Sequence, residues 1–197
     1  MSELEKRLLL VLGGARSGKS SYAEATAARI AGEHGRVLYV ATAQPLDDEM
    51  ARRIARHRLD RPATWPTLEE PIDPGPAIAT APGGPFAVVL LDCVTIWLSN
   101  LLIGPDHDPE VLPGEEQAGA IAGAAVDRLL AAHRDGSATT ILVSNEVGMG
   151  VVPPYPLGRI YRDLLGRVNA RLADEADEVY LLIAGLPLRI KPNSGLS

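Results

Sequence analysis

The stretch Gly13-Gly14-Ala15-Arg16-Ser17-Gly18-Lys19-Ser20 has the pattern G-x-x-x-x-G-K-S, the phosphate-binding P-loop pattern. The apolar residues 8–12 before it are typical of a buried parallel strand, and the Ala-rich residues 21–31 after it favour a helix. A strand, a glycine-rich loop and a helix N-terminus direct backbone N–H groups at one point, where they favour an anion. The stretch therefore predicts a nucleoside triphosphate site in an α/β domain.

Each residue of this loop has an expected task. Gly13 and Gly18 permit backbone conformations and close approaches that a Cβ atom would block. Lys19 is expected to reach the β- and γ-phosphates, and the Ser20 hydroxyl to bind Mg²⁺. The other loop residues expected to contact the nucleotide are Gly14, Ala15, Arg16 and Ser17. The pattern predicts triphosphate binding but not the reaction that follows.

The composition favours one globular domain over residues 1–197. Hydrophobic residues make up 46% of the chain, enough for one sizeable core. The formal charge of −6 and the 4% of aromatic residues argue against a nucleic-acid-binding surface. Cys93 is the single cysteine, which excludes an internal disulfide and a cysteine zinc cluster. The charged residues 1–7 do not resemble a signal peptide and no stretch reads as a membrane span, so a cytoplasmic protein is expected.

Strand and helix patterns alternate after the loop, which predicts a mostly parallel sheet with helices on both faces. Strands are expected over residues 36–41, 87–92, 139–144, 178–184 and 188–191. Helices are expected over residues 47–58, 94–102, 115–133 and 157–176. The last strand is expected to form an antiparallel hairpin through a turn at 185–187. The Pro- and Gly-rich residues 62–85 predict irregular chain with a short strand near Trp65 and a short helix near Ala77, and residues 104–117 predict a surface insertion.

Four polar segments follow predicted strands: residues 13–20, 42–44, Asp92 and residues 145–150. Ligands of open α/β sheets bind at the carboxyl ends of the strands, so these segments are expected to form one site. Asp92 ends an apolar strand expected to lie beside the P-loop strand, the arrangement of a Walker B acid that holds Mg²⁺ directly or through water. A helix N-cap is the alternative role for Asp92, but a P-loop in the same chain favours the metal or nucleotide role.

Residues 52–61 contain five arginines and His57 in an otherwise acidic chain. One interpretation is a second phosphate-binding surface. The other is a solvated helix face, on which Asp48 pairs with Arg52 and Glu49 pairs with Arg53 one helical turn later. Composition alone leaves both interpretations open and slightly favours the second.

His57 itself also has two interpretations. A neutral imidazole nitrogen can attack the α-phosphate of a nucleoside triphosphate to give a nucleotidyl-histidine, and the flanking Arg56 and Arg58 can stabilise charge on the phosphates. The spacing of Met50, Ile54 and His57 equally fits a histidine that borders the core. From the residues alone, the second interpretation is favoured.

Several classes of P-loop protein can be compared with this chain. A signalling GTPase carries N-K-x-D after a strand, whereas Ser144-Asn145-Glu146-Val147 at the comparable place lacks the Lys and the Asp. A helicase or recombination motor needs basic and aromatic surface that this composition lacks. A non-catalytic nucleotide-sensing module stays open, and nucleotide binding without turnover would support it. A small-molecule kinase fits the size and the motif best.

Over nearly its whole length the sequence resembles the bifunctional adenosylcobinamide kinase / adenosylcobinamide-phosphate guanylyltransferase family of cobalamin biosynthesis. The matching segments are GGARSGKS (13–20), VLYVATAQ (37–44), DDEMARRIARH (47–57), RPATW (61–65), LLDCVT (90–95), NEVGMGVVP (145–153), GRVNARLA (166–173) and AGLPLRIK (184–191). The P-loop, the DDEM run and the NEVGMG loop together make the resemblance specific.

The resemblance implies a RecA-like sheet, a trimer and two reactions. ATP or GTP phosphorylates the aminopropanol hydroxyl of adenosylcobinamide. GTP then guanylylates an enzyme histidine, and the phosphorylated substrate accepts GMP to give adenosylcobinamide-GDP. His57 matches that histidine, so the resemblance favours the nucleophile interpretation. The residues that it places around GTP, beyond the P-loop, are Thr42, Ala43, Gln44, Arg58, Leu59, Asp60, Arg61, Glu69 and Asp92.

Among these, a carboxylate such as Glu69 can accept hydrogen bonds from guanine N1–H and the guanine amino group, which adenine cannot supply. The chain departs from the family pattern at three places. Arg56 stands where members often have a second histidine, and Asp92 where many have Glu. The segment 104–117 is longer than usual. These departures remove no required group, and the shorter Asp92 predicts contact with Mg²⁺ through water.

Overall fold

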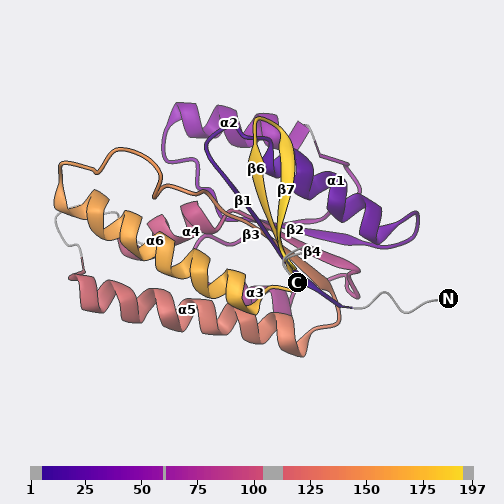
Figure 1. Ribbon diagram of the computed structural model, residues 1–197. Helices are drawn as coiled ribbons and strands as arrows, with labels where there is room; N and C mark the ends of the chain where they lie inside the picture. Colours follow the sequence, from indigo (N-terminus) through magenta and orange to yellow (C-terminus); the bar gives the residue numbers. More distant parts are fainter. Residues whose placement is uncertain (1–5, 60, 104–112, 193–197) are drawn as a thin grey trace.

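The computed structural model describes residues 6–59, 61–103 and 113–192 (Figure 1). A seven-stranded sheet forms its centre, in the order β3-β2-β4-β5-β1-β6-β7. The strands are β1 (Leu8–Gly13), β2 (Val37–Ala41), β3 (Thr67–Glu69), β4 (Val88–Asp92), β5 (Thr139–Val143), β6 (Glu178–Ile183) and β7 (Leu186–Lys191). Neighbouring strands pair in parallel except β6 with β7, which pair antiparallel. The predicted fold class is confirmed.

Six helices are described, and they cover both faces of the sheet (Figure 1). They are α1 (Lys19–Ala31), α2 (Asp48–Leu59), α3 (Pro74–Ala79), α4 (Val94–Ile103), α5 (Glu115–Asp135) and α6 (Pro156–Glu175). The predicted helices are present within two residues at every end, and the short helix near Ala77 is α3.

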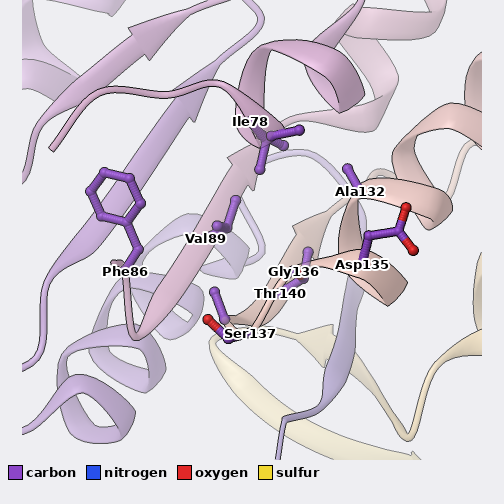
Figure 2. Close-up of a pocket in the computed structure, with 10 residues that line it drawn as sticks. Ile78, Phe86, Val89, Ala132, Asp135, Gly136, Ser137 and Thr140 are labelled. Carbon is purple, nitrogen blue, oxygen red and sulfur yellow. The ribbon is translucent and has the colours of Figure 1, made fainter. Parts of the chain in front are cut away.

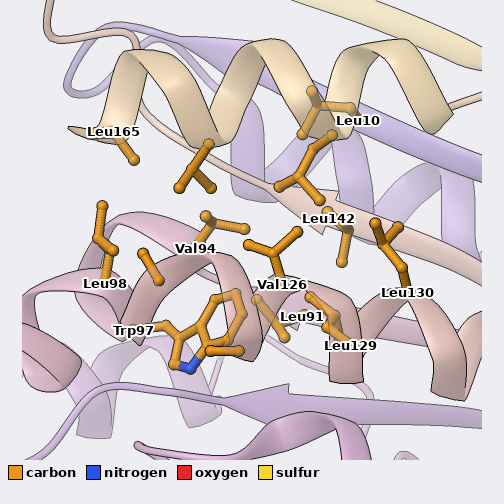
Figure 3. Close-up of a cluster of buried hydrophobic side chains, with 14 of the residues drawn as sticks. Leu10, Leu91, Val94, Trp97, Leu98, Val126, Leu129, Leu130, Leu142 and Leu165 are labelled. Atoms are coloured by element: carbon orange, nitrogen blue, oxygen red, sulfur yellow. The ribbon is translucent and has the colours of Figure 1, made fainter. Parts of the chain in front are cut away.

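Two hydrophobic clusters lie on opposite faces of the sheet because side chains alternate along each strand. Leu9 and Val11 of β1 pack on α1 through Ala23 and Ala27. On the other face, side chains of β1, β4 and β5 pack against α4, α5 and α6, as Figure 3 shows for Leu10, Leu91 and Leu142. Burial on both faces explains why the central strands are continuous apolar runs.

The predicted position of the Asp92 strand is wrong in one respect. β4 does not lie beside the P-loop strand β1, because β5 lies between them and pairs with both. Strand order depends on which helix crosses which face, and hydrophobic patterning within one strand carries no information on it. The carboxyl ends of β1, β2, β4 and β5 still lie at one edge, since all four strands are parallel.

The hairpin turn is also earlier in the chain than predicted. Ala184 and Gly185 form it with φ angles of 51° and 84°, so β7 already begins at Leu186. Positive φ at both central residues matches the twist of a two-residue hairpin. Pro187 indicated a turn, but β7 is the edge strand of the sheet, where a residue without an N–H is tolerated.

Helix α2 differs from the other long helices because none of its residues is buried. Asp47 caps it, since its Oδ1 accepts a hydrogen bond from the Met50 N–H at 2.6 Å. His57 is exposed, so the interpretation that it borders the core is wrong.

The two ion pairs predicted along α2 are absent from the described residues: Asp48 does not pair with Arg52, nor Glu49 with Arg53. Residues 104–112 of the predicted insertion, and Asp60, lie outside the described residues, and Glu115 already begins α5. None of the described helices combines the length and the hydropathy that a membrane span requires.

Candidate nucleotide-binding site

The P-loop leaves β1 at Gly13, where only glycine fits. A Cβ atom there would lie 2.6 Å from both the Leu182 carbonyl oxygen and Ser17 Oγ. Gly18 has a φ of 92°, a conformation that side chains with a Cβ rarely adopt. Both positions therefore have the backbone constraint that the pattern predicts.

Lys19 begins α1 and is buried at the base of the loop. Its Nζ donates to the Gly14 carbonyl oxygen at 2.6 Å, which directs the ammonium group back over the loop. Burial lowers the pKa of Lys19 from its ordinary value, and the nearby Asp92 charge acts in the opposite direction. Asp92 lies two strands away from the P-loop strand, because it pairs with Val143 of β5 and Val143 pairs with Val11 of β1.

The start of α1 favours an anion. Its N-cap is Gly18, which offers no side chain to the first-turn N–H groups. Ser17 Oγ is buried and, within the described part of the chain, has no hydrogen-bond partner. A bound phosphate would satisfy these groups, so the loop fits the terminal phosphates of a nucleotide.

Two neighbouring loops hold the P-loop from its sides. The Gly185 N–H of the β6–β7 turn donates to the Ser17 carbonyl oxygen at 3.0 Å. The Glu146 N–H, after β5, donates to the Gly13 carbonyl oxygen, also at 3.0 Å. The loop is thus fixed by contacts that the P-loop motif itself does not encode.

Asp92 ends β4 with a half-buried carboxylate that the Tyr39 hydroxyl orients. The Tyr39 OH donates to Asp92 Oδ2 at 3.1 Å. Burial, followed by the charge of Asp92, raises the pKa of Tyr39 well above its usual range, so the phenol remains a donor. In the part of the chain that the structure describes, this bond occupies Oδ2, and Oδ1 of Asp92 remains for another ligand.

The oxygen donors Ser20 and Asp92 fit Mg²⁺, which prefers oxygen ligands and usually retains several waters. Among the described residues, no group of three or more His, Cys, Asp and Glu side chains could hold a metal ion by itself. Two protein oxygens together with nucleotide phosphates and water match the usual magnesium site of a phosphate-transferring enzyme.

The end of α2 is attached to the sheet by two arginines. Arg61 donates from Nε to the His57 carbonyl oxygen at 2.8 Å, and its guanidinium lies 3.7 Å from the centre of the Tyr39 ring. Arg58 forms an ion pair with Glu69 at the end of β3. A line of contacts therefore runs from the backbone of His57 through Arg61 and Tyr39 to Asp92.

Of the other predicted nucleotide residues, Thr42 is fully buried. Its hydroxyl donates to the Cys93 carbonyl oxygen and accepts from the Cys93 N–H, each at 2.9 Å. Its side chain therefore ties the end of β2 to the end of β4. Ala43 and Gln44 are half-buried in the following loop, and Leu59 is exposed.

Two cavities lie elsewhere. One, of about 320 Å³, lies at the amino ends of β4 and β5, between α3 and the end of α5 (Figure 2). Ile78, Phe86 and Val89 are among its lining residues. The other includes Trp65 and the chain after α1. Neither cavity is lined by the predicted nucleotide residues, which gather at the opposite edge of the sheet.

Sequence reasoning missed two residues that shape the site, Tyr39 and Asn100, and did not foresee how Glu146 of the predicted segment 145–150 contacts the P-loop. Tyr39 orients Asp92, and Asn100 donates to the carbonyl oxygens of Thr42 and Pro71 at 2.8 and 3.1 Å. Glu146 contacts the P-loop through its backbone. A tyrosine within an apolar strand and an asparagine within an apolar helix were the available signals, because a buried polar group requires a partner.

Comparison with known proteins gives the family. Residues 9–190 match the family described as cobinamide kinase / cobinamide phosphate guanyltransferase. The chain belongs to this family. The bifunctional adenosylcobalamin biosynthesis protein CobU of Escherichia coli K12 is 46% identical over 188 residues, which are 93% of this chain and 99% of that protein. CobP of Pseudomonas aeruginosa, a protein of the same description, is 45% identical over 184 residues, 92% of this chain and 96% of the relative.

A solved structure of an ATPase domain is also similar to this cobinamide kinase / guanyltransferase family member, with a TM-score of 0.51 and 12% sequence identity. The match covers 89% of this chain and 69% of that domain. At this identity the likeness concerns the fold alone, which is that of a P-loop ATPase domain. The family match confirms the resemblance found in the sequence, and the likeness to this domain agrees with the predicted fold.

Proposed function

We propose that this chain carries out both activities that name its family, with one P-loop cradle holding the triphosphate for each. It phosphorylates adenosylcobinamide with ATP or GTP and then transfers GMP from GTP to the product through His57. Family membership supports the two reactions, and the contacts around the P-loop support the shared cradle. The observation that carries the proposal is the arrangement of Lys19, the uncapped start of α1 and Asp92 at one edge of the sheet.

In the first reaction the substrate hydroxyl attacks the γ-phosphorus. The bond between that phosphorus and the β–γ bridging oxygen breaks, and a nucleoside diphosphate leaves. Lys19 and the first-turn N–H groups of α1 stabilise negative charge on the β- and γ-phosphates. Their positions on a rigid loop hold the phosphates in line with the acceptor.

In the second reaction the neutral imidazole of His57 attacks the α-phosphorus of GTP, and pyrophosphate leaves. Arg58 and Arg61 follow His57 and supply positive charge for the developing charge on the phosphates. A phosphate oxygen of the phosphorylated substrate then attacks the same phosphorus. The bond from His57 breaks, and the substrate carries away GMP.

Mg²⁺, held by Ser20 and Asp92, would neutralise charge on the phosphates in both reactions. Tyr39 keeps Asp92 oriented for this role through its hydrogen bond. Glu69 is the proposed reader of guanine. Its carboxylate already pairs with Arg58, but a carboxylate has enough acceptor sites to bind guanine at the same time.

We further propose a homotrimer that works in the cytoplasm as a single domain. Exposed apolar side chains on the edge strand β7 support an association surface there; Leu186 is 72% exposed and Leu188 57% exposed. A second exposed apolar segment, with Met149, Val151 and Val152, follows Glu146 at the catalytic edge. We assign that segment to corrinoid docking.

The proposed trimer is tested by sedimentation equilibrium, which should give a trimer for the wild type and a smaller species for Leu188→Lys.

The central experiment separates the two activities. Incubation with GTP labelled at the α-phosphate should leave acid-labile label on the chain, and His57→Ala should abolish that label while phosphorylation of adenosylcobinamide continues. His34→Ala, which changes an exposed histidine after α1, is the matched control and should label normally. Label that persists in His57→Ala would exclude His57 as the carrier.

A further inference from the structure

Glu146 lies between the two halves of the nucleotide site. Val143, the last residue of β5, is paired with Val11 of the P-loop strand on one side and with Asp92 on the other. Glu146 follows three residues later in the chain, and its N–H donates to the Gly13 carbonyl oxygen at 3.0 Å. Its half-buried carboxylate therefore belongs to the edge where the triphosphate and its acceptor meet.

Two hydrogen bonds hold the backbone of Asn145, the residue before Glu146. The Asn145 N–H donates to Thr95 Oγ1 at 2.8 Å, and Asn169 Nδ2 donates to the Asn145 carbonyl oxygen at 3.0 Å. The carboxylate is oriented as well, because its Oε1 accepts from the Gly148 N–H at 2.9 Å. A group fixed in this way costs little further ordering when a substrate binds.

Three group transfers make up the proposed function, and only one of them requires a base. The imidazole of His57 attacks as a neutral nitrogen with a free electron pair, and the phosphorylated substrate attacks through an oxygen that is already anionic. The hydroxyl of the unphosphorylated substrate must lose a proton as it attacks. Phosphoryl transfer is therefore the step in which a carboxylate at this edge can accept a proton, a role that no P-loop residue performs.

We propose that Glu146 is the general base of the phosphoryl transfer; this inference rests on the proposed function. The substrate oxygen forms a bond to the γ-phosphorus while its proton moves to the Glu146 carboxylate. The bond from the γ-phosphorus to the bridging oxygen breaks, and the nucleoside diphosphate takes that electron pair. Glu146 returns the proton to solvent after the product leaves, so the enzyme is unchanged.

Glu146→Gln tests the assignment because the amide oxygen can still accept from the Gly148 N–H while the side chain can no longer accept a proton. Three rates are measured on each protein: phosphorylation of adenosylcobinamide, labelling of the chain by α-labelled GTP, and transfer of GMP to adenosylcobinamide phosphate supplied directly. We expect kcat for phosphorylation to fall ~10²- to 10⁴-fold. The other two rates should stay within about twofold of the wild type, as should all three in the control Glu33→Gln, an exposed glutamate after α1.

Two results would overturn the assignment. Unchanged phosphorylation in Glu146→Gln shows that the carboxylate is not the base. An equal loss in all three rates shows a structural or metal-binding role, and a weaker Mn²⁺ affinity in the nucleotide complex would identify the second of these. Failure of the proposed function itself looks different, because the wild type would then not phosphorylate adenosylcobinamide at all.

Discussion

The P-loop and helix α2 carry the two reactive parts of the proposed mechanism, and the fold holds them very differently. Every residue of β1 is buried, Lys19 is buried, and hydrogen bonds from Glu146 and Gly185 fix the loop. Helix α2 has no buried residue. Its start is capped by Asp47, and its end is attached through Arg58 and Arg61.

This difference suits two different tasks. The P-loop, residues 13–20, is a fixed holder of the triphosphate, and helix α2 with His57 is a movable carrier of GMP. Phosphoryl transfer needs the triphosphate in one place, whereas a histidine that accepts GMP from one molecule and gives it to another must meet two partners. A segment with few buried apolar contacts opens at low free-energy cost, and such segments commonly close over substrates. Damage to the P-loop should therefore affect every reaction, and damage to the attachment of α2 only the guanylyl transfer.

Lys19→Ala should have the largest effect and should not distinguish the two reactions. Loss of the buried ammonium removes a donor to the phosphates, so both rates should fall ~10³-fold, equivalent to about 4 kcal/mol. Phosphorylation of adenosylcobinamide and labelling of the chain by GTP are measured side by side. Lys191→Ala is the control, because Lys191 Nζ donates to carbonyl oxygens at the end of α6. Loss of one reaction alone would require two separate nucleotide sites.

Gly13→Ala should distort the P-loop through steric overlap. The new methyl group would be forced to within 2.6 Å of the Leu182 carbonyl oxygen, and the loop would have to shift. Overpacking of this kind costs about 2 kcal/mol in the free energy of unfolding, and both reactions should weaken together. Urea denaturation measures the stability. Gly14→Ala is the matched control one residue later, where a Cβ atom would meet nothing within 4 Å. Equal stability of the two variants would show that the P-loop is not rigid.

The holder could be predicted from the sequence to a much greater extent than the carrier. A P-loop is a local feature: a strand, two glycines, a lysine and a helix start follow one another in the chain, so the pattern contains its own geometry. The parallel sheet followed from the strand and helix alternation for the same reason. The order of the strands did not follow, because the place of β5 between β1 and β4 is decided by packing between distant segments.

The surroundings of His57 depend on contacts that no local pattern encodes. Spacing along α2 favoured a histidine at the border of the core, yet the helix lies apart from the core and is attached at its end. Stacking of Arg61 on Tyr39 joins residues that are far apart in the chain, as does the pair of Arg58 with Glu69. The family resemblance identified His57, whereas only the structure shows what holds its helix. Glu146 is a similar case, because its contact with Gly13 exists only in the folded chain.

Arg61→Ala should give the smallest of the three effects, and it should separate the guanylyl transfer from the phosphorylation most clearly. The change removes the stacking on Tyr39 and the hydrogen bond to the His57 carbonyl oxygen, and leaves the P-loop intact. Labelling of the chain by GTP should slow ~10-fold, about 1.4 kcal/mol, because the end of α2 is less often in place. Phosphorylation with ATP should be unchanged. Arg53→Ala, at an exposed position on α2, is the control.

The kinetic constants distinguish a positioning role for Arg61 from direct binding of GTP phosphates. If Arg61 positions His57, the labelling rate at saturating GTP falls and the GTP concentration at half-maximal rate stays the same. If Arg61 binds the phosphates, the half-maximal concentration rises instead. Tyr39→Phe adds a second criterion, because it keeps the ring beneath Arg61 but removes the hydroxyl from Asp92. Tyr39→Phe should raise the Mg²⁺ concentration needed in both reactions, because Asp92 belongs to the part of the site that both reactions share. Arg61→Ala should leave that Mg²⁺ concentration unchanged.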